Sequence, residues 1–257
     1  MQTIDTRTGV VLLAVEVVVL LVLWQVLVGT FEVINPTFFP PPLDTLQGFK
    51  ELFASDDLAE HVTTSLKAWL TGYALVVVVG IGMGLLIGTS LPVDKLAMPW
   101  VWTLYATPLL AYQPLAKAWF GFGIGPIIFL VFIGSVFPLL FNTAAGMRTV
   151  SRSLINAGRI FGASRRQLYF KVLLPATLPY IMAGMRQSAV IATISLIVAE
   201  MTTTSVGMGS LIVFTANQYN TDESFAAIVM VVVWSLTMTT VIGLLARRLV
   251  PWSGGGR

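Results

Sequence analysis

The stretch Asn156-Ala157-Gly158-Arg159-Ile160-Phe161-Gly162-Ala163-Ser164, followed by Leu174-Pro175 and then Pro179, says most about the fold of this chain. It is a basic, polar segment between long apolar runs, and its glycines and alanines leave room for another backbone to approach closely. The two prolines are expected to break the helix before the chain re-enters apolar sequence. The segment predicts a docking surface formed by Asn156, Ala157, Gly158, Gly162, Ala163, Ser164, Leu174 and Pro175.

The composition of the 257-residue chain indicates a membrane protein. Hydrophobic residues make up 56% and charged residues only 11%, whereas soluble domains carry about 25% charged residues. The net charge of +3 is small, so no nucleic-acid partner is expected. The lack of cysteine excludes disulfides and thiolate chemistry, and the single histidine, His61, leaves no cluster for a metal. We therefore expect no catalytic residue, no metal site and no cofactor in this chain.

Six apolar segments approach the length of a membrane span, since a helix needs about 20 apolar residues to cross the hydrocarbon core. The first is too long for a signal-peptide core and no small-residue cleavage site follows it, so we interpret it as an uncleaved anchor. The fourth is short and is expected to extend to either side. The prediction is an all-α, polytopic membrane protein with one transmembrane domain, 1–257. Its spans are 8–29, 65–88, 96–114, 126–141, 179–199 and 225–246, with a loop over 142–178.

The orientation of the spans follows from the basic residues, which gather on the cytoplasmic side of membrane proteins. With the N-terminus inside, eleven basic residues are cytoplasmic, and the opposite topology would place all of them outside. Both termini are therefore predicted to lie in the cytoplasm. The eleven residues are Arg7, Lys95, Arg148, Arg152, Arg159, Arg165, Arg166, Lys171, Arg247, Arg248 and Arg257.

Two outer segments are expected to be structured. The first has a proline-rich turn over 35–42. It continues as a short helix on the outer membrane surface, with an apolar stripe of Leu43, Leu46, Phe49 and Phe53. The second lies over 205–221 and has Gly207 and Gly209 near its start.

The segment over 142–178 resembles the cytoplasmic coupling loop of ABC-importer permeases, whose pattern is Glu-Ala-Ala, three residues, Gly, a longer gap, then Leu-Pro. Ala157, Gly162 and Leu174-Pro175 match this pattern at the right spacing, while Asn156 replaces Glu and Gly158 replaces Ala. Further elements over 38–246 follow in order those of the nitrate/sulfonate/taurine class of these permeases. They are Phe39-Pro40-Pro41-Pro42, Pro114-Leu115, Trp119-Phe120-Gly121-Phe122-Gly123, Phe137-Pro138, Gly146-Met147-Arg148, Ala199-Glu200 and Gly207-Met208-Gly209.

The resemblance implies the permease fold of a type I ABC importer and a set of partners. Two ATPase copies would bind ATP and Mg²⁺ and receive the coupling helices, a second and identical permease chain would complete the path, and an extracytoplasmic binding protein would deliver the solute. No lysine stands in a phosphate-binding Gly-Lys-Ser/Thr motif, so any ATPase is a separate chain. Membrane lipid is the remaining partner.

Charged groups inside spans are costly and need a reason. Lys117 lies near the outer end of the third span. It is placed either to bind an anionic substrate or to extend to the membrane interface, and both interpretations stay open. Arg186 lies within the fifth span, either at the inner gate or reaching the inner surface. A structural tie to another span is favoured for Glu200. The residues predicted to line the translocation path, called the path residues below, are Tyr112, Gln113, Lys117, Arg186 and Glu200. The basic Lys117 and Arg186 favour a small anionic solute.

Gly80, Gly84 and Gly88 recur every four residues in the second span. This pattern permits close helix contact, and packing within one chain is favoured over dimerisation. Two other classes of protein remain as alternatives, a stand-alone secondary transporter or channel and a membrane-embedded enzyme. Dependence of transport on a separate ATPase distinguishes the importer permease from both.

Overall fold

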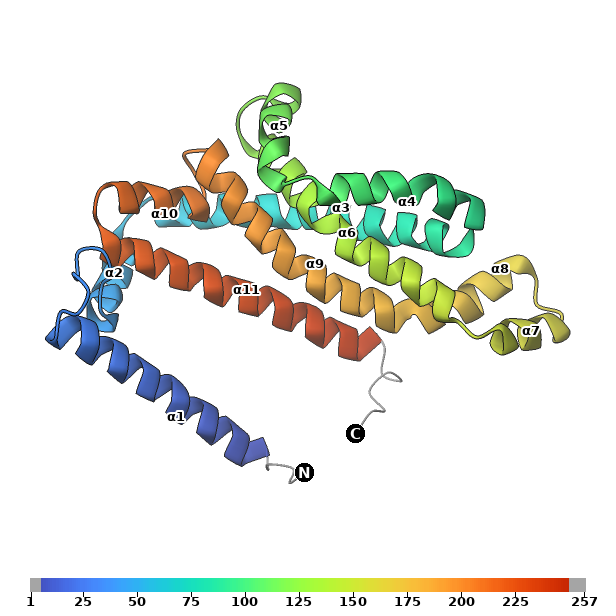
Figure 1. Cartoon of the computed structure of the whole chain (residues 1–257), viewed down its shortest axis with the longest axis horizontal. Coiled ribbons are helices and arrows are strands. Elements are labelled where there is room, and N and C mark those ends of the chain that lie inside the picture. The colour runs from blue at the N-terminus through green and yellow to red at the C-terminus, as the bar shows by residue number, and fades with distance from the viewer. Residues whose placement is uncertain (1–5, 250–257) are drawn as a thin grey trace. The chain divides into compact units, whose positions relative to one another are not determined.

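The computed structural model describes residues 6–249, which form helices and connecting loops without a strand, so the predicted all-α fold is confirmed (Figure 1). The described residues belong to two compact units. One comprises residues up to Ala59 together with Leu211–Val231, and the other comprises Glu60–Ser210 together with the chain from Val232 onward. Helices α10 (Met208–Asn217) and α11 (Thr221–Leu249) contribute residues to both units.

The first unit contains α1 (Thr6–Trp24), which continues as the wider π-helical turn η1 (Gln25–Thr30), and α2 (Pro42–Ala54). The side chains of α1 from Val11 to Leu23 are exposed and apolar apart from Glu16, as expected of a helix surrounded by lipid. Pro42 lies in the first turn of α2, where a missing N–H breaks no helical hydrogen bond.

Helix α2 buries a face other than its predicted apolar stripe. Thr45, Gly48 and Leu52 are buried, whereas Leu43, Leu46 and Phe53 remain exposed. Gly48 packs directly on the backbone at Asp222, where α11 begins, and any side chain there would clash. Within the stripe only Phe49 is half-buried, so most of the stripe stays uncovered, and Gly48 permits the close approach of α2 to α11.

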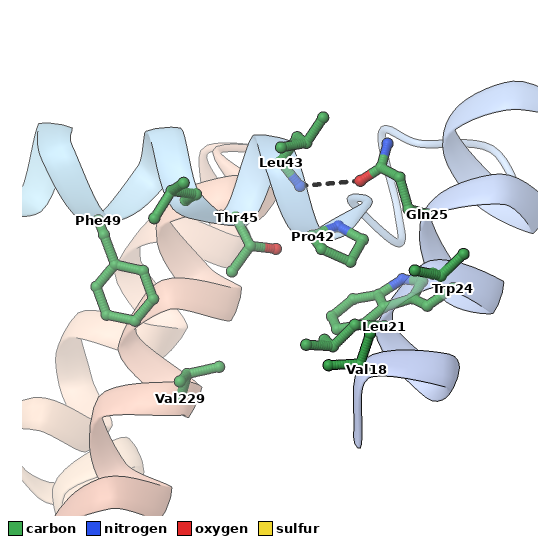
Figure 2. A pocket seen from close by; sticks show the side chains of 11 residues that line it. Val18, Leu21, Trp24, Gln25, Pro42, Leu43, Thr45, Phe49 and Val229 are labelled. Carbon is green, nitrogen blue, oxygen red and sulfur yellow. Dashed lines mark hydrogen bonds between the residues drawn. The ribbon is translucent and has the colours of Figure 1, made fainter. Parts of the chain in front are cut away.

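A groove of about 580 Å³ lies between α1, α2 and the first part of α11 (Figure 2). Val18, Leu21 and Trp24 line it from α1, and Val229 faces them from α11. One hydrogen bond at its edge joins α2 to η1, from the backbone N–H of Leu43 to Oε1 of Gln25 over 3.1 Å. Because its walls are almost wholly apolar, the groove suits hydrocarbon and offers little to a polar solute.

The second unit is built around α6 (Ile124–Thr149) and α9 (Leu174–Thr203), which pack along each other (Figure 1). Apolar side chains from both helices fill the core, among them Ile127, Val131, Leu139 and Leu196. The remaining elements are α3 (Leu58–Thr89), α4 (Leu91–Ala106), η2 (Leu109–Tyr112), α5 (Gln113–Phe120), α7 (Arg152–Ile160), α8 (Arg165–Leu168) and η3 (Tyr169–Leu173).

Helix α3 approaches α6 through its predicted glycine stripe. A Cβ at Gly84 would lie 2.6 Å from the Cβ of Thr143, and one at Gly88 would lie 2.6 Å from the Cβ of Met147. At Gly80 the nearest atom would be a side-chain carbon of Leu139, at 3.0 Å. The three glycines therefore face a neighbouring helix of the same chain.

The predicted count of six spanning helices is not confirmed. Among the described residues, five helices are long and apolar enough to cross a membrane, namely Val11–Thr30, Leu58–Thr89, Ile124–Thr149, Arg165–Thr203 and Thr221–Ala246. The prediction of one helix over 96–114 is wrong, because α4 ends at Ala106 and Thr107 has extended backbone angles. A residue before proline disfavours the helical region, and Pro108 follows here. The chain then resumes as η2 and α5.

The helix break predicted at Pro175 and Pro179 is also wrong. The helical path runs without interruption from Arg165 to Thr203, with Pro175 in the first turn of α9 and Pro179 inside it. The π turn η3 directly precedes this point, and its wider spacing is the kind of irregularity that lets a helix accommodate proline. Much of the segment predicted as a loop over 142–178 is therefore helical, since α6 also continues to Thr149.

Candidate functional site

The segment predicted to couple to an ATPase forms a short, well-capped helix. The Ser151 hydroxyl accepts a hydrogen bond from the N–H of Leu154 at the start of α7. At its end Gly162 adopts a left-handed conformation with φ of 74°. The N–H groups of Gly162 and Ala163 donate to the carbonyls of Arg159 and Gly158, which is the Schellman arrangement. These residues fix where α7 stops and how the chain turns away.

The next helix begins directly after this turn. Ser164 and Gln167 form a reciprocal capping box at the start of α8. Gly158 faces Leu168, and a Cβ at Gly158 would lie 2.6 Å from a methyl group of that leucine. Leu174 and Pro175 are half-buried at the beginning of α9. Four of the predicted docking residues (Gly158, Ser164, Leu174 and Pro175) therefore lie where they shape the segment itself.

The exposed face of α7 carries large apolar side chains that the sequence prediction did not include. Ile160 is 83% exposed and Phe161 is 89% exposed, with Leu154 also exposed on the same short helix. Asn156 and Gly162 are exposed beside them, and Ala157 and Ala163 are half-buried. Because the segment is predicted to contact an ATPase, we call Leu154, Ile160 and Phe161 the coupling surface. An exposed apolar surface surrounded by basic residues is typical of a protein interface.

Glu200 lies at the centre of a buried hydrogen-bond network near the end of α9. Its Oε1 accepts from the Ser65 hydroxyl of α3 over 2.6 Å, and its Oε2 accepts from the N–H of Gly209 over 2.9 Å. Ser65 accepts in turn from the N–H of Met208 over 2.9 Å. The carboxyl group thus ties α9 to α3 and to the first turn of α10. We call Ser65, Glu200, Gly207, Met208 and Gly209 the Glu200 node.

Gly207 belongs to this node because a side chain at its position would be strained and would clash with Glu200. Its φ is 138°, and a Cβ there would lie 2.5 Å from the carboxyl carbon of Glu200. His61 holds the same residue from α3, with its Nδ1 at 2.9 Å from the carbonyl oxygen of Gly207 and 3.0 Å from its N–H nitrogen. The sequence did not predict this role in positioning a loop; it indicated only that His61 belongs to no metal-binding cluster.

Lys117 and Gln113 both extend from α5 to the last turn of α9. The Lys117 ammonium donates to the carbonyl oxygen of Thr202 over 3.2 Å, and the Gln113 amide donates to the same oxygen over 2.8 Å. Cations near the carboxyl end of a helix interact favourably with its free carbonyls and its dipole. The geometry thus gives Lys117 a helix-capping contact.

Tyr112 lies at the break in the predicted third span. Its hydroxyl donates to the carbonyl oxygen of Leu104 over 2.8 Å, across the interruption at Thr107 and Pro108. A cleft of about 320 Å³ opens here, and Tyr105 and Phe137 contribute to its walls. Tyr112 is thus placed at a cavity, yet its hydroxyl is already engaged by the chain.

Arg186 is the one predicted path residue that faces open space without a partner in the described chain. It is exposed, and it lines a cleft of about 310 Å³ between α9 and α11. A Cβ at Gly243 would lie 3.3 Å from a terminal nitrogen of its guanidinium group. We call Arg186, Thr239, Thr240, Gly243 and Leu244 the Arg186 cleft. The five predicted path residues therefore do not form one site, since Arg186 lies fourteen positions before Glu200 on α9.

Known proteins with similar sequences identify the class to which this architecture belongs. A protein named aliphatic sulfonates transport permease protein SsuC, from Bacillus subtilis, is 34% identical over 234 residues, which cover 91% of this chain and 84% of that protein. The nitrate import permease protein NrtB of Leptolyngbya laminosa is 32% identical over 191 residues, covering 74% and 68%. The fold matches a chain of the inward-facing MetNI methionine ABC transporter with a TM-score of 0.67 and 17% identity, over 75% of this chain and 95% of that chain.

These similarities define the class as permease subunits of ABC importers. The family model described as binding-protein-dependent transport system inner membrane component matches residues 77–253, and this chain belongs to that family. It is a non-catalytic permease subunit, and ATP hydrolysis in such systems takes place on a separate chain. The resemblance drawn from the coupling-loop pattern is confirmed.

Proposed function

We propose that this permease, paired with a second identical chain, forms the path for a small oxyanion such as an alkanesulfonate or nitrate. The observation that carries this proposal is the similarity to relatives named for sulfonate and nitrate transport, which covers most of the chain. Both anions present negatively charged oxygens of similar chemistry. An extracytoplasmic binding protein would deliver the anion and supply much of the selectivity.

Coupling to ATP takes place at the coupling surface of Leu154, Ile160 and Phe161. Two ATPase copies, which bind ATP and Mg²⁺, each receive α7 from one permease chain. The capped ends of α7 and its packing through Gly158 on Leu168 support this assignment, because a rigid short helix can transmit motion to α9. The predicted residues Asn156, Ala157, Gly162 and Ala163 border this surface, while Ser164, Leu174 and Pro175 continue the chain toward α9.

The chain lies in the cell membrane with both termini in the cytoplasm. Arg148, Arg152, Arg159, Arg165 and Arg166 are then on the cytoplasmic side with the coupling surface, in agreement with the distribution of basic residues. Lipid surrounds α1 and occupies the apolar groove beside it. The interrupted third span, from α4 through η2 to α5, crosses the membrane as a sixth segment. A stand-alone secondary transporter would leave the coupling surface without a use.

The experiment that tests the coupling proposal compares two equally exposed phenylalanines. Phe161 is 89% exposed on the coupling surface, and Phe122 is 91% exposed in the loop between α5 and α6. Phe161→Ser should abolish co-purification of the ATPase while the permease remains in the membrane, and Phe122→Ser should retain it. Retention of the ATPase by Phe161→Ser would show that the contact lies elsewhere.

The oxyanion proposal is tested by transport. Proteoliposomes that contain the permease, its ATPase and its binding protein should accumulate an alkanesulfonate or nitrate when ATP is enclosed with the ATPase. Uptake that depends on ATP but excludes both anions would overturn the solute class and leave the importer assignment in place.

A further inference from the structure

The charges of this chain are divided unevenly along the sequence. Residues 95–199 and 224–257 contain twelve of the fifteen basic residues and no aspartate or glutamate. All twelve acidic residues lie outside these two stretches. Most of α9 and nearly all of α11 therefore have no carboxylate of their own to balance a positive charge.

Arg186 is the basic residue for which this imbalance matters most, because it lies within a spanning helix. Moving an arginine into the centre of a membrane helix costs about 2.5–3.5 kcal/mol even on insertion scales, so such residues face water or a partner. The one ion pair among the described residues joins Arg148 to Asp94 and does not involve Arg186. The guanidinium group also donates no hydrogen bond to the part of the chain that the structure describes.

The walls of the Arg186 cleft are suited to a small polar ligand. Thr240 is exposed and lines the cleft together with Arg186, and Gly243 leaves the space that a side chain would fill. Gly243 lies six residues before the end of α11 at Leu249, or about 9 Å at 1.5 Å per residue. The cleft is therefore close enough to one end of the helix for an ion to enter from that side.

We propose that the Arg186 cleft binds an oxyanion, with the guanidinium of Arg186 as the charged donor and the Thr240 hydroxyl as a second donor. A guanidinium presents two parallel N–H groups that match the oxygens of sulfonate, nitrate or phosphate. The oxyanion is either the transported solute on its way through the cleft or the phosphate of a lipid headgroup. The first source rests on the function proposed above, and the second does not.

The absence of native cysteine makes a direct test of this site possible. Thr240→Cys places the one thiol of the permease in the Arg186 cleft, where it can react with methanethiosulfonate reagents. The complex with its ATPase is purified in uncharged maltoside detergent, and labelling is read as a mass change of the permease chain. Each rate is divided by the rate of the same reagent with a free thiol in solution. On this scale the anionic ethylsulfonate reagent should react about tenfold faster than the cationic trimethylammonium reagent, because a local positive charge concentrates anions.

Arg186 variants in the Thr240→Cys background provide the control. Arg186→Gln should abolish the preference for the anionic reagent, and Arg186→Lys should largely keep it. Equal rates for the two reagents with Arg186 intact, an unchanged preference in Arg186→Gln, or no labelling by either reagent would each overturn the proposal.

Protection of the cysteine from labelling distinguishes the two sources of the oxyanion. Slower labelling by the anionic reagent in the presence of nitrate or methanesulfonate identifies a solute site, whereas slower labelling with phosphatidylglycerol alone identifies a headgroup site. Failure of all three to protect would contradict anion binding in the cleft. Because labelling requires no transport, a failure of the transport assay described above leaves this result independent.

Discussion

Helix α9 carries an acidic residue in the Glu200 node and a basic residue in the Arg186 cleft, and the two side chains differ in burial and in hydrogen bonding. Glu200 is fully buried, and both of its oxygens accept hydrogen bonds from groups of this chain. Arg186 is exposed, and no carboxylate of the described chain pairs with it. A charge that the chain itself satisfies holds helices together, whereas a charge left open is available to something else. The following variants test this distinction through their effect on stability.

Removal of the Glu200 carboxyl should have the largest effect. Glu200→Ala leaves the Ser65 hydroxyl and the N–H of Gly209 buried without an acceptor. Each such unpaired group costs about 1–3 kcal/mol. We expect the melting temperature of the purified permease to fall by roughly 5–20 °C, on the scale of about 2–4 °C per kcal/mol for chains of this size. The exposed Glu16 of α1 provides a matched control, and an equal loss in Glu16→Ala would contradict the special role of the node.

Two glycines allow the same comparison, because Gly207 lies against Glu200 and Gly243 lies near Arg186. Gly207→Ala places a Cβ against the Glu200 carboxyl and requires a φ of 138° that alanine rarely adopts. Such a conformation costs on the order of 1–3 kcal/mol. Gly243→Ala brings a Cβ only to within 3.3 Å of the flexible end of Arg186. We expect Gly207→Ala to lower the melting temperature clearly and Gly243→Ala to leave it nearly unchanged; similar losses in both would remove the contrast.

A smaller effect is expected at the contact between α5 and the end of α9. Lys117→Ala removes one of two donors to the carbonyl of Thr202, and the Gln113 amide retains the shorter hydrogen bond. The expected loss of stability is about 0.3–1 kcal/mol, the range for a solvent-accessible cation near the carboxyl end of a helix. Because the contact is structural, transport of the solute should change in proportion to the amount of folded protein. A specific rise in KM for the solute would instead support a substrate contact for Lys117.

Five of the six predicted spans overlap long apolar helices of the described chain, although the helices extend beyond the predicted bounds. The sequence could not decide which prolines interrupt a helix. Pro99, Pro138 and Pro179 all lie inside helices, whereas Pro108 follows a break. The local effect of proline on the backbone is the same in each case, so packing by neighbouring helices determines whether the freed backbone groups are accommodated. That information is not contained in the residues next to the proline.

The features of the candidate sites also differ in whether the sequence alone could predict them. The charge imbalance around Arg186 can be read from the sequence, because it depends only on which residue types are present in two long stretches. The partners of Glu200 cannot, since Ser65 is separated from it by 135 positions and meets it only in the folded chain. Ile160 and Phe161 were missed because small residues gave the signal for docking, while exposure of the large ones depends on how α7 ends.

The smallest effect on stability is expected at Arg186 itself. Arg186→Gln removes a charge that makes no ion pair in the described chain. The free energy of unfolding should therefore change by no more than about 0.5 kcal/mol, as at other exposed sites, and the melting temperature should change little. If the cleft handles the transported anion, the same variant should reduce the rate of uptake by roughly tenfold to a hundredfold, the range expected for losing a charged hydrogen bond of about 1.5–3 kcal/mol. ATPase co-purification serves as the control, because the coupling surface is unaltered. A stable, assembled variant with normal uptake would leave lipid phosphate as the ligand of the cleft, whereas an unstable variant would show that Arg186, like Glu200, holds helices together.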